Sequence, residues 1–394
     1  MSRGSPPEIV TTDRALEALC ARIVEAGRFA FDTEFVAEES YQPTVCLIQI
    51  ALDGHCALID PMAGLDATPL WNLVADPAIE TLVHAGSEDL ALCRQAVGRP
   101  PANVFDIQIA GGFVGWGYPT SLARIVRLTA KTTLHKSQTL TDWRKRPLSP
   151  EQVRYAVEDV VHLPKAYRLL TARLAELGRS AWVAEECARL CAATLPADDP
   201  QVKLRRLKGS GSLTARELAV ADAIMAERDI LAREYDRPAR TILKDHLLVE
   251  LARRGWTDIK KMRTLRGINV SDAGLRRMAA AIERAKLTPV EELPEVTAVE
   301  EDPVEDILGT LASAVLKDYC RREGVAYSLL TNKAELRAVV ARHADPKAET
   351  KPSMLDVGWR RAAVGGLLNE VLSGTARLRI RREKGELGLY VEPL

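Results

Sequence analysis

The stretch "FAFDTEF" at residues 29–35 places two acids inside an otherwise apolar run with the composition of a β-strand. Side chains two residues apart on a strand share a face, so Asp32 and Glu34 present their carboxylates together. Two such charges repel each other unless a cation compensates them, and carboxylates of this kind commonly bind Mg²⁺. The local pattern therefore fits either a metal site or a strand end exposed to solvent.

The first 200 residues alternate short β-rich runs with amphipathic runs, which predicts a mixed α/β domain. We expect strands at residues 28–35, 44–52, 55–60, 80–85 and 103–108. Helices are predicted at residues 87–97 and 149–177, the second with Ser149 as its cap, Pro150 in its first turn and a kink at Pro164. The predicted sheet thus has helices to pack against it.

The chain of 394 residues is too long for a single core, and its later segments differ in composition. Helical patterns dominate residues 201–288, whereas residues 289–306 hold three prolines and eight acids with no basic residue, as in a linker. After the linker come helical patterns near 307–343 and 356–373, and then a β-hairpin around Lys384-Gly385. The predicted domains are residues 1–200, 201–288 and 307–394, with 289–306 as an acidic linker.

The formal net charge of zero conceals an uneven distribution. Residues 1–200 carry 19 basic against 25 acidic side chains, residues 201–288 carry 20 against 11, and residues 289–394 carry 15 against 18. The middle block, with an excess of nine positive charges, favours a polyanionic partner, although solvated helix surfaces would explain it equally well.

The seven cysteines do not have the paired CxxC spacing of zinc ribbons or redox motifs, which indicates reduced and mostly buried thiols. The start "MSRGSPPEIV" has no apolar segment, and no run of about 18 apolar residues occurs in the chain. We therefore expect a cytoplasmic protein that does not enter a membrane. The sequence does not indicate an oligomeric state.

Two further stretches place polar groups at informative positions. In "LVHAGSEDLALC" (82–93) an apolar strand leads into a helix with Asp89 near its first turn, where helix capping alone would also explain an acid. In "VRYAVEDVVHL" (153–163) Tyr155 and Asp159 are four residues apart and so share one helical face, as they also would in a surface hydrogen bond.

Together, the order DxE, Asp and YxxxD resembles the DEDDy group of 3′-5′ exonucleases, and the surrounding words resemble ribonuclease D. These sequence motifs are "FDTEF", "VHAGSEDL", "FDIQIAG", "LHKSQTLTDWRKRPLS" and "YAVEDVVHL", and they occur in the family's order over residues 28–170. The resemblance implies an RNase H-like domain with a mixed sheet flanked by helices. It also implies that Asp32, Glu34, Asp89 and Asp159 hold two Mg²⁺ or Mn²⁺ ions and that Tyr155 orients the attacking water. The implied reaction releases nucleoside 5′-monophosphates from a free 3′ end of RNA, with tRNA precursors as the substrates that the family suggests.

Residues 207–268 resemble the helicase-and-RNase-D C-terminal (HRDC) domain, a helical nucleic-acid-binding module, and coincide with the basic block. The expected RNA contacts, which could instead only solubilise helices, are Lys203, Arg205, Arg206, Lys208, Lys260, Lys261, Arg263 and Arg266. The small α+β unit at 307–394 is open to interpretation as a diverged second HRDC-like domain, although its hairpin departs from that pattern. RNA binding, packing on the exonuclease domain and a protein contact all remain open for it.

Other polar residues near the motifs have competing interpretations. His84 and His162 are expected to be structural, because Mg²⁺ prefers oxygen ligands. The basic loop that contains Lys136 and residues 144–146 could contact RNA or simply be solvated, and Trp143 could stack on a base or pack within its own domain.

Two alternatives to an exoribonuclease stay open at this point: a non-catalytic RNA-binding scaffold and an exonuclease that acts on DNA. The presence of all five site residues of the resemblance favours an enzyme. Because all five precede residue 200, we expect a fragment that ends there to keep the chemistry.

Overall fold

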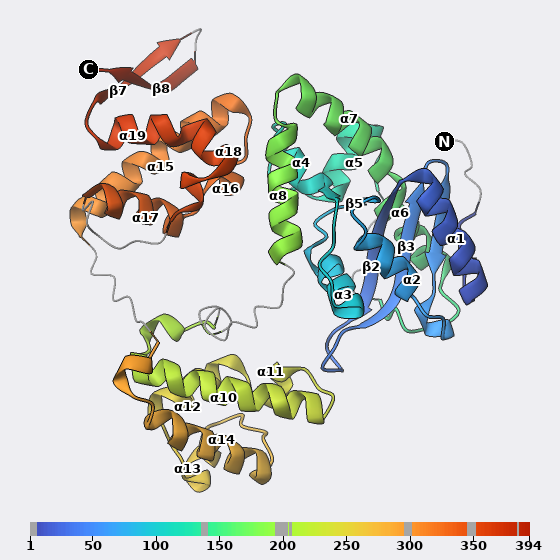
Figure 1. Cartoon of the computed structure of the whole chain (residues 1–394), viewed down its shortest axis with the longest axis vertical. Coiled ribbons are helices and arrows are strands. Elements are labelled where there is room, and N and C mark those ends of the chain that lie inside the picture. Colours follow the sequence, from blue (N-terminus) through green and yellow to red (C-terminus); the bar gives the residue numbers. More distant parts are fainter. Residues whose placement is uncertain are drawn as a thin grey trace. The chain divides into compact units, whose positions relative to one another are not determined.

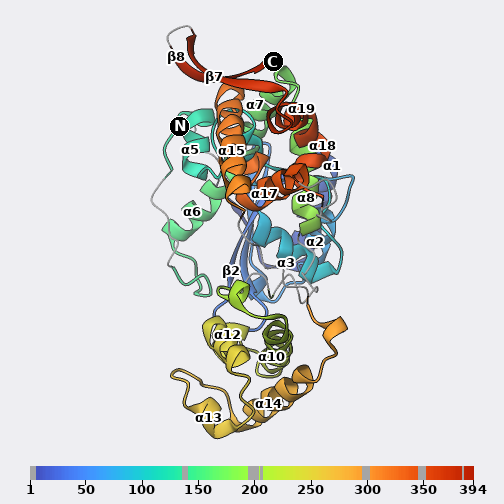
Figure 2. The same cartoon turned by 90° about the vertical axis from the view of Figure 1, so that its left-hand side faces the viewer.

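The chain divides into two compact units in the computed structural model (Figures 1 and 2). The first comprises Met1–Thr33, Ile48–Thr194 and Glu300–Leu394, and the second Glu34–Leu47 and Leu195–Val299. The structure describes residues 6–134, 141–193, 204, 207–294, 302–344, 352–383 and 386–394. None of the helices in these ranges is both long and apolar enough to span a bilayer.

A six-stranded mixed sheet forms the centre of the exonuclease-like part, as predicted. Its strands are β1 (Glu8–Val10), β2 (Arg28–Val36), β3 (Thr44–Leu52), β4 (His55–Ile59), β5 (Glu80–Val83) and β6 (Val104–Asp106), in the order β1-β4-β3-β2-β5-β6. Strands β3 and β4 are antiparallel, whereas β1 pairs with β4, β2 with β5, and β5 with β6 in parallel. Only the short β1 is absent from the sequence prediction, because three residues show no periodicity.

In the described part of the chain, eight helices between residues 13 and 193 flank this sheet. They are α1 (Asp13–Ala26), α2 (Thr68–Val74), α3 (Ser87–Val97), α4 (Ile107–Gly112), α5 (Leu122–Ala130), α6 (Pro150–Val161), α7 (Leu163–Glu176) and α8 (Ser180–Ala193). The helix predicted at 149–177 is two helices that meet at His162, next to Pro164, which has no N–H to continue the hydrogen-bond pattern. Ser149 caps α6 in a reciprocal capping box with Gln152.

The predicted strand 103–108 is shorter in the structure. Strand β6 ends at Asp106, and the next residues already belong to α4. Asp106 itself ends the strand, because its carboxylate accepts the backbone N–H groups of Gln108 and Ile109 and so caps the helix.

The second unit is a helical bundle around an apolar core. It contains α10 (Ala215–Glu234), α11 (Ala239–Ile242), α12 (Asp245–Arg254), α13 (Ile259–Arg263) and α14 (Asp272–Lys286). A capping box of Thr214 with Glu217 begins α10, and Gly255, in the left-handed conformation, ends α12. Within this unit the ring of Tyr41 packs against the helical core, and its hydroxyl donates to Asp229 on α10 at 3.1 Å.

The C-terminal segment is helical and ends in a hairpin. Its elements are α15 (Pro303–Glu323), α16 (Tyr327–Leu330), α17 (Lys333–Ala344), α18 (Gly358–Arg360), a π-helical turn (Arg361–Gly365), α19 (Gly366–Leu372), β7 (Ala376–Glu383) and β8 (Glu386–Pro393). The antiparallel hairpin agrees with the prediction, while its turn at residues 384–385 lies outside the described residues.

Helix α15 begins at Pro303, so the end of the stretch assigned to a linker is wrong. Asp302 caps the helix and Pro303 occupies its first position, while Glu305 and Asp306 lie in its first turn beside the positive end of the helix dipole. Acids and prolines that suggest a linker by composition therefore act here as helix-start signals.

The C-terminal segment shares one hydrophobic core with the exonuclease-like part. Trp359 is 3% exposed, and its ring centroid lies 5.0 Å from that of Phe113 and 4.9 Å from that of Trp182. Next to it, Arg360 forms a buried ion pair with Glu186 on α8, at 2.5 Å. Of the three roles left open for this segment, packing on the exonuclease domain is therefore observed.

Candidate active site

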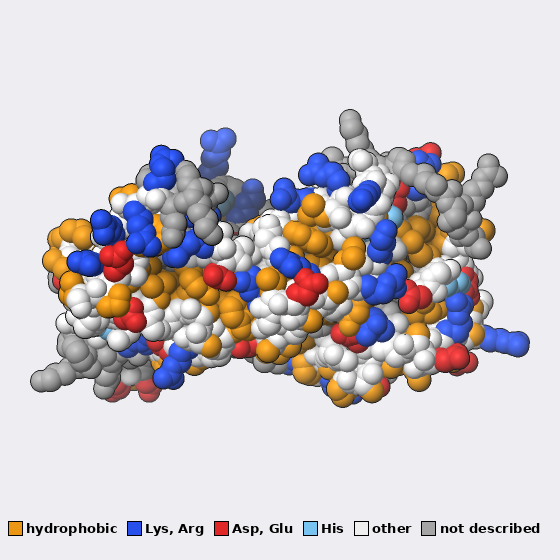
Figure 3. All heavy atoms as spheres, turned by 90° about the horizontal axis from the view of Figure 1, so that it is seen from above, with side chains coloured by type: hydrophobic (Ala, Val, Ile, Leu, Met, Phe, Trp, Pro, Cys, Tyr) orange, Lys and Arg blue, Asp and Glu red, His pale blue; other side chains and the backbone are white. Residues whose placement is uncertain are grey.

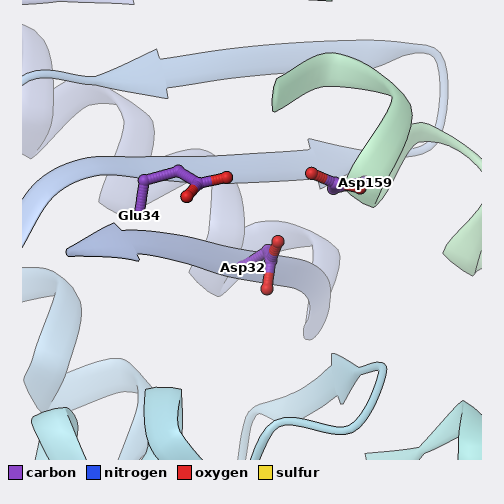
Figure 4. Close-up of side chains that lie close together, drawn as sticks. All are labelled: Asp32, Glu34 and Asp159. Carbon is purple, nitrogen blue, oxygen red and sulfur yellow. The ribbon is translucent and has the colours of Figure 1, made fainter. Parts of the chain in front are cut away.

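Three acids from two elements meet beside the central strand of the sheet (Figure 4). Asp32 and Glu34 lie on β2, and Asp159 lies in the last turn of α6. One carboxylate oxygen from each residue lies within 4.8 Å of the others, and all three residues are partly buried. The structure thus brings together three of the four acids that the resemblance assigns to metal binding.

Burial and neighbouring charges act on one acid of this group, Asp159. Burial, and then the charges of Glu158 and Asp89, raise the pKa of Asp159 from 3.8 to about 7. The carboxylate is therefore on the point of protonation near neutral pH, although an exposed aspartate would be fully ionised.

The donor set fits a hard divalent cation. All three groups offer oxygen, which Mg²⁺ and Mn²⁺ prefer, and none offers nitrogen or sulfur. Ligand oxygens of one octahedral Mg²⁺ are about 3 to 4 Å apart, given bonds of about 2.0 to 2.1 Å. The separation of up to 4.8 Å needs only a small contraction to reach that geometry.

Asp89 lies outside this group of three. It is 7% exposed in the first turn of α3, and one of its carboxylate oxygens accepts a hydrogen bond from the hydroxyl of Thr33. Burial raises the pKa of Asp89, and its charge contributes to the raised pKa of Asp159. Asp89 is therefore electrostatically coupled to the acidic group and attached to β2 at the residue between Asp32 and Glu34.

Tyr155 lies one helical turn before Asp159 on α6, as the spacing predicts. Its ring centroid is 5.9 Å from that of Trp143, which is 5% exposed. Trp143 therefore packs within its own domain beside Tyr155, so it does not offer a free face for a base.

Two supporting residues were not singled out from the sequence. Thr33 holds Asp89, and Asp106, 2% exposed, accepts the backbone N–H groups of Ala85 and Gly86 at 3.3 and 3.2 Å. These bonds fix the turn that leads into α3, where Ala85 has a positive φ of 57°. A signal was available for Asp106, because an acid directly after the apolar run of β6 is as unusual as the acids of β2.

The histidines have structural surroundings. A ring nitrogen of His84 lies 3.0 Å from the carbonyl oxygen of Thr120, and burial lowers the pKa of this imidazole. His162 lies at the junction of α6 and α7. Neither belongs to the metal-ligand group found among the described residues.

Several basic residues proposed for RNA contact are engaged within the fold. Arg146 makes two hydrogen bonds to the carboxylate of Asp60, at 2.5 and 2.6 Å, and Arg144 pairs with Asp142 at 2.9 Å. Four other expected contacts lie outside the described residues: Lys136, Lys203, Arg205 and Arg206.

Comparisons with known proteins identify the family and agree with the fold. A family model described as "3'-5' exonuclease" matches residues 7–175, and an HRDC domain model matches residues 217–283. A ribonuclease D of Jannaschia sp. (strain CCS1) is 32% identical over 387 residues, which cover 96% of this chain and 98% of that protein. The chain belongs to the ribonuclease D family.

Other ribonuclease D relatives support the assignment. The ribonuclease D of Zymomonas mobilis is 32% identical over 385 residues, covering 95% of this chain and 96% of that one. The crystal structure of Escherichia coli RNase D, described as an exoribonuclease involved in structured RNA processing, aligns with a TM-score of 0.81 at 27% identity over 93% of this chain and 99% of that chain. The catalytic core of RRP6 from Trypanosoma brucei aligns with a TM-score of 0.56 at 26% identity, over 72% and 81% of the two chains. The resemblance, the fold class and the prediction of an enzyme of the ribonuclease D type are thereby confirmed.

Proposed function

We propose that this protein hydrolyses RNA from a free 3′ end with the help of two divalent cations and releases nucleoside 5′-monophosphates one at a time. The observation that carries the proposal is the group of Asp32, Glu34 and Asp159, with its raised pKa at Asp159, in a chain of the ribonuclease D family. Three partly buried carboxylates within 4.8 Å of one another lower the stability of the folded state, and a bound cation would offset that cost.

In this proposal each acid has a defined task. Asp32, Glu34 and Asp159 supply oxygen ligands from two different elements, and Asp89 completes the set from α3, restrained by Thr33. Bound Mg²⁺ or Mn²⁺ would supply a water of lowered pKa and positive charge for the phosphate oxygens and the leaving 3′-oxygen. The acids hold their positions beforehand because β2, α3 and α6 are fixed by the core.

Tyr155 is the proposed positioning group for the attacking water. Its helix places the phenol one turn from Asp159, and the buried Trp143 restricts the ring. A phenol hydroxyl can accept one hydrogen bond and donate another, which suffices to orient a water molecule.

The substrate is proposed to be RNA, with tRNA precursors as its cellular form, because relatives over nearly the full chain are ribonucleases. We assign the chemistry to residues 1–200 and the binding of the RNA backbone to residues 201–288. This second stretch contains 20 basic and 11 acidic side chains. The proposed phosphate contacts among the described residues are Lys208, Lys260, Lys261, Arg263 and Arg266, of which Arg263 also pairs with Asp272 at 2.5 Å.

The test uses purified full-length protein with matched RNA and DNA strands, labelled at either end. We expect the wild type with Mg²⁺ to release labelled mononucleotides first from 3′-labelled RNA and to leave a circular RNA intact. EDTA should stop the reaction, and Mg²⁺ or Mn²⁺ should restore it; Ca²⁺ should not, because its coordination is looser.

Variants connect the activity to the acids. Asp32→Asn should abolish hydrolysis while melting and RNA affinity are retained, and Glu88→Gln, an exposed acid beside Asp89, is the matched control that should stay active. Full activity of Asp32→Asn would refute the metal proposal. Faster hydrolysis of DNA than of RNA would favour the alternative substrate, since the acids do not read a 2′-hydroxyl.

A further inference from the structure

A chain of hydrogen bonds in the interior joins the C-terminal segment to α3, the helix that carries Asp89. The surface is less distinctive: on the face that Figure 3 shows, basic, acidic and apolar side chains are interspersed, as on an ordinary solvated surface. Asp89 is the one proposed ligand outside the group of three acids. The contacts that hold α3 therefore decide whether its carboxylate can join that group.

The turn that begins α3 is held by Asp106. The carboxylate of this residue, which is 2% exposed, accepts the backbone N–H groups of Ala85 at 3.3 Å and Gly86 at 3.2 Å. Ala85 has a φ of 57°, a conformation that costs free energy in a residue with a side chain and persists where neighbouring contacts hold it. A Cβ on Gly86 would lie 2.7 Å from the side chain of Val83, so the turn also packs closely on the end of β5. Because α3 starts at this turn, a shift of the turn moves Asp89.

His84 ties the same turn to a second segment. It directly precedes Ala85, and its Nε2 lies 3.0 Å from the carbonyl oxygen of Thr120. Since a carbonyl oxygen only accepts, Nε2 carries the proton in this bond, whether the ring is neutral or charged. The same carbonyl accepts the side-chain amide of Gln108 at 2.9 Å, and the backbone N–H of Gln108 donates to Asp106 at 2.7 Å. These side chains thus form one hydrogen-bonded network at the start of α3.

The loop that accepts the histidine bond is also the loop on which the C-terminal segment packs. The hydroxyl of Ser328 on α16 donates to the carbonyl oxygen of Tyr118 at 2.9 Å. Leu329, 5% exposed, packs on Gly112 at the end of α4, where a Cβ would collide with it. Tyr118 is only two residues before Thr120, so a short piece of backbone connects the C-terminal segment with the network at α3.

We propose that His84 is a positioning residue for Asp89, an inference that rests on the proposed function. Its bond to Thr120 holds the start of α3 against the loop on which the C-terminal segment packs. Thr33 restrains the carboxylate of Asp89 from β2, and His84 restrains the helix that carries it. The site therefore has its full affinity for a divalent cation only while the C-terminal segment is docked.

Mg²⁺ titration of the full-length protein, followed by calorimetry, measures this affinity without hydrolysis. His84→Leu removes the donor and should raise the Kd for Mg²⁺ about 10-fold, the lower end of the range for groups that orient metal ligands from outside. His84→Gln should retain most of the affinity, because its amide nitrogen can donate to the same carbonyl. Thr129→Val is the matched control: it removes a buried hydroxyl bond to the carbonyl oxygen of Ile125, at 2.9 Å within α5, and should lower the Tm in EDTA without changing the Kd.

Hydrolysis provides a second readout that separates positioning from a general loss of structure. At limiting Mg²⁺, His84→Leu should have a lower kcat with an unchanged KM for RNA. Excess Mg²⁺ should restore its rate by mass action, because the defect is one of metal affinity. A defect in the fold alone would lower the rate equally at every Mg²⁺ concentration and would overturn the inference.

Leu329→Ala tests the part played by the C-terminal segment. If this segment acts through His84, the loss of Mg²⁺ affinity in the double variant with His84→Leu should be smaller than the product of the two separate fold-changes. Melting in EDTA shows whether each variant is folded. Ser328→Ala, which removes an exposed hydroxyl, takes the place of Leu329→Ala if that variant does not fold. Fold-changes that simply multiply would overturn the link to the C-terminal segment.

Asp32→Asn distinguishes this inference from the proposed function. The proposed function predicts that the wild type binds Mg²⁺ and that Asp32→Asn does not. If both results hold and His84→Leu binds Mg²⁺ with the wild-type Kd, His84 is not a positioning residue. A wild type that binds no Mg²⁺, or an Asp32→Asn variant that binds it as tightly as the wild type, would refute the proposed function itself.

Discussion

Replacing Asp159 by asparagine should stabilise the metal-free protein while it destroys the proposed metal site. Its pKa of about 7 lies about 3 pH units above the ordinary value of 3.8, and each unit corresponds to about 1.36 kcal/mol. For an acid with a raised pKa, the folded state prefers the protonated form. Stability is therefore highest below pH 3.8, falls between pH 4 and 7, and is lowest above pH 7, with a total cost of about 4 kcal/mol.

The assay is thermal melting in EDTA at constant ionic strength, followed by tryptophan fluorescence. From pH 5 to pH 8 the wild type should lose about 3 kcal/mol more than Asp159→Asn, since about 2 units of that interval lie below the raised pKa. This corresponds to about 6 to 12 °C in Tm for a domain of this size. Asp53→Asn, a carboxylate whose side chain is 79% exposed, is the control and should melt in parallel with the wild type.

Added Mg²⁺ provides the second half of the test. A cation that needs the ionised carboxylate should raise the Tm of the wild type more at pH 8 than at pH 5, because protons compete with the metal at the lower pH. The same addition should have little effect on Asp159→Asn. If the wild type and Asp159→Asn show parallel stability curves in EDTA between pH 5 and pH 8, the carboxylate does not carry the strain that we assign to it.

Two further changes test the site and its support. Tyr155→Phe should lower kcat by about 10- to 1,000-fold with little effect on Tm, because it removes one positioning hydroxyl and keeps the ring against Trp143; an unchanged kcat would leave the tyrosine a structural role. A fragment that ends at residue 200 should lose at least about 3 kcal/mol, or about 6 to 12 °C in Tm, because it removes Trp359 from Phe113 and Trp182; urea and thermal unfolding equal to those of the full chain would contradict this.

The prediction for the fragment revises the expectation from sequence. All five proposed site residues do precede residue 200, but the core that supports them does not end there. The chain returns after residue 300 to cover α4 and α8, so the catalytic part depends on a segment that follows it by more than 100 residues.

Two of the site acids were predictable because they violate local rules, whereas Asp89 and Asp159 were assigned to the site only through the resemblance to the DEDDy exonucleases. Asp32 and Glu34 interrupt an apolar strand, and a sequence tolerates such a conflict mainly where function compensates for it. The same rule applies to Asp106, an acid at the last position of the apolar strand β6, where it caps α4. Thr33 offered no such signal, because threonine is common in strands and its bond to Asp89 joins residues 56 positions apart.

The packing of the C-terminal segment could not be predicted for the opposite reason. Trp359 and Arg360 lie in a stretch whose sequence shows only a helical pattern, and their partner on α8, Glu186, is more than 170 residues away. A buried ion pair such as Arg360 with Glu186 contributes little net stability by itself, yet removing one partner leaves a buried charge that costs about 3 to 5 kcal/mol. This pair therefore adds little stability to the correct packing of the C-terminal segment, but it strongly destabilises arrangements that bury one of the two charges without the other. The proposed site and this interface thus use the same physical cost in two ways: at Asp159 we propose that a cation offsets the cost of ionising a partly buried carboxylate, and at Glu186 the chain's own arginine offsets it, which specifies where the returning segment must pack.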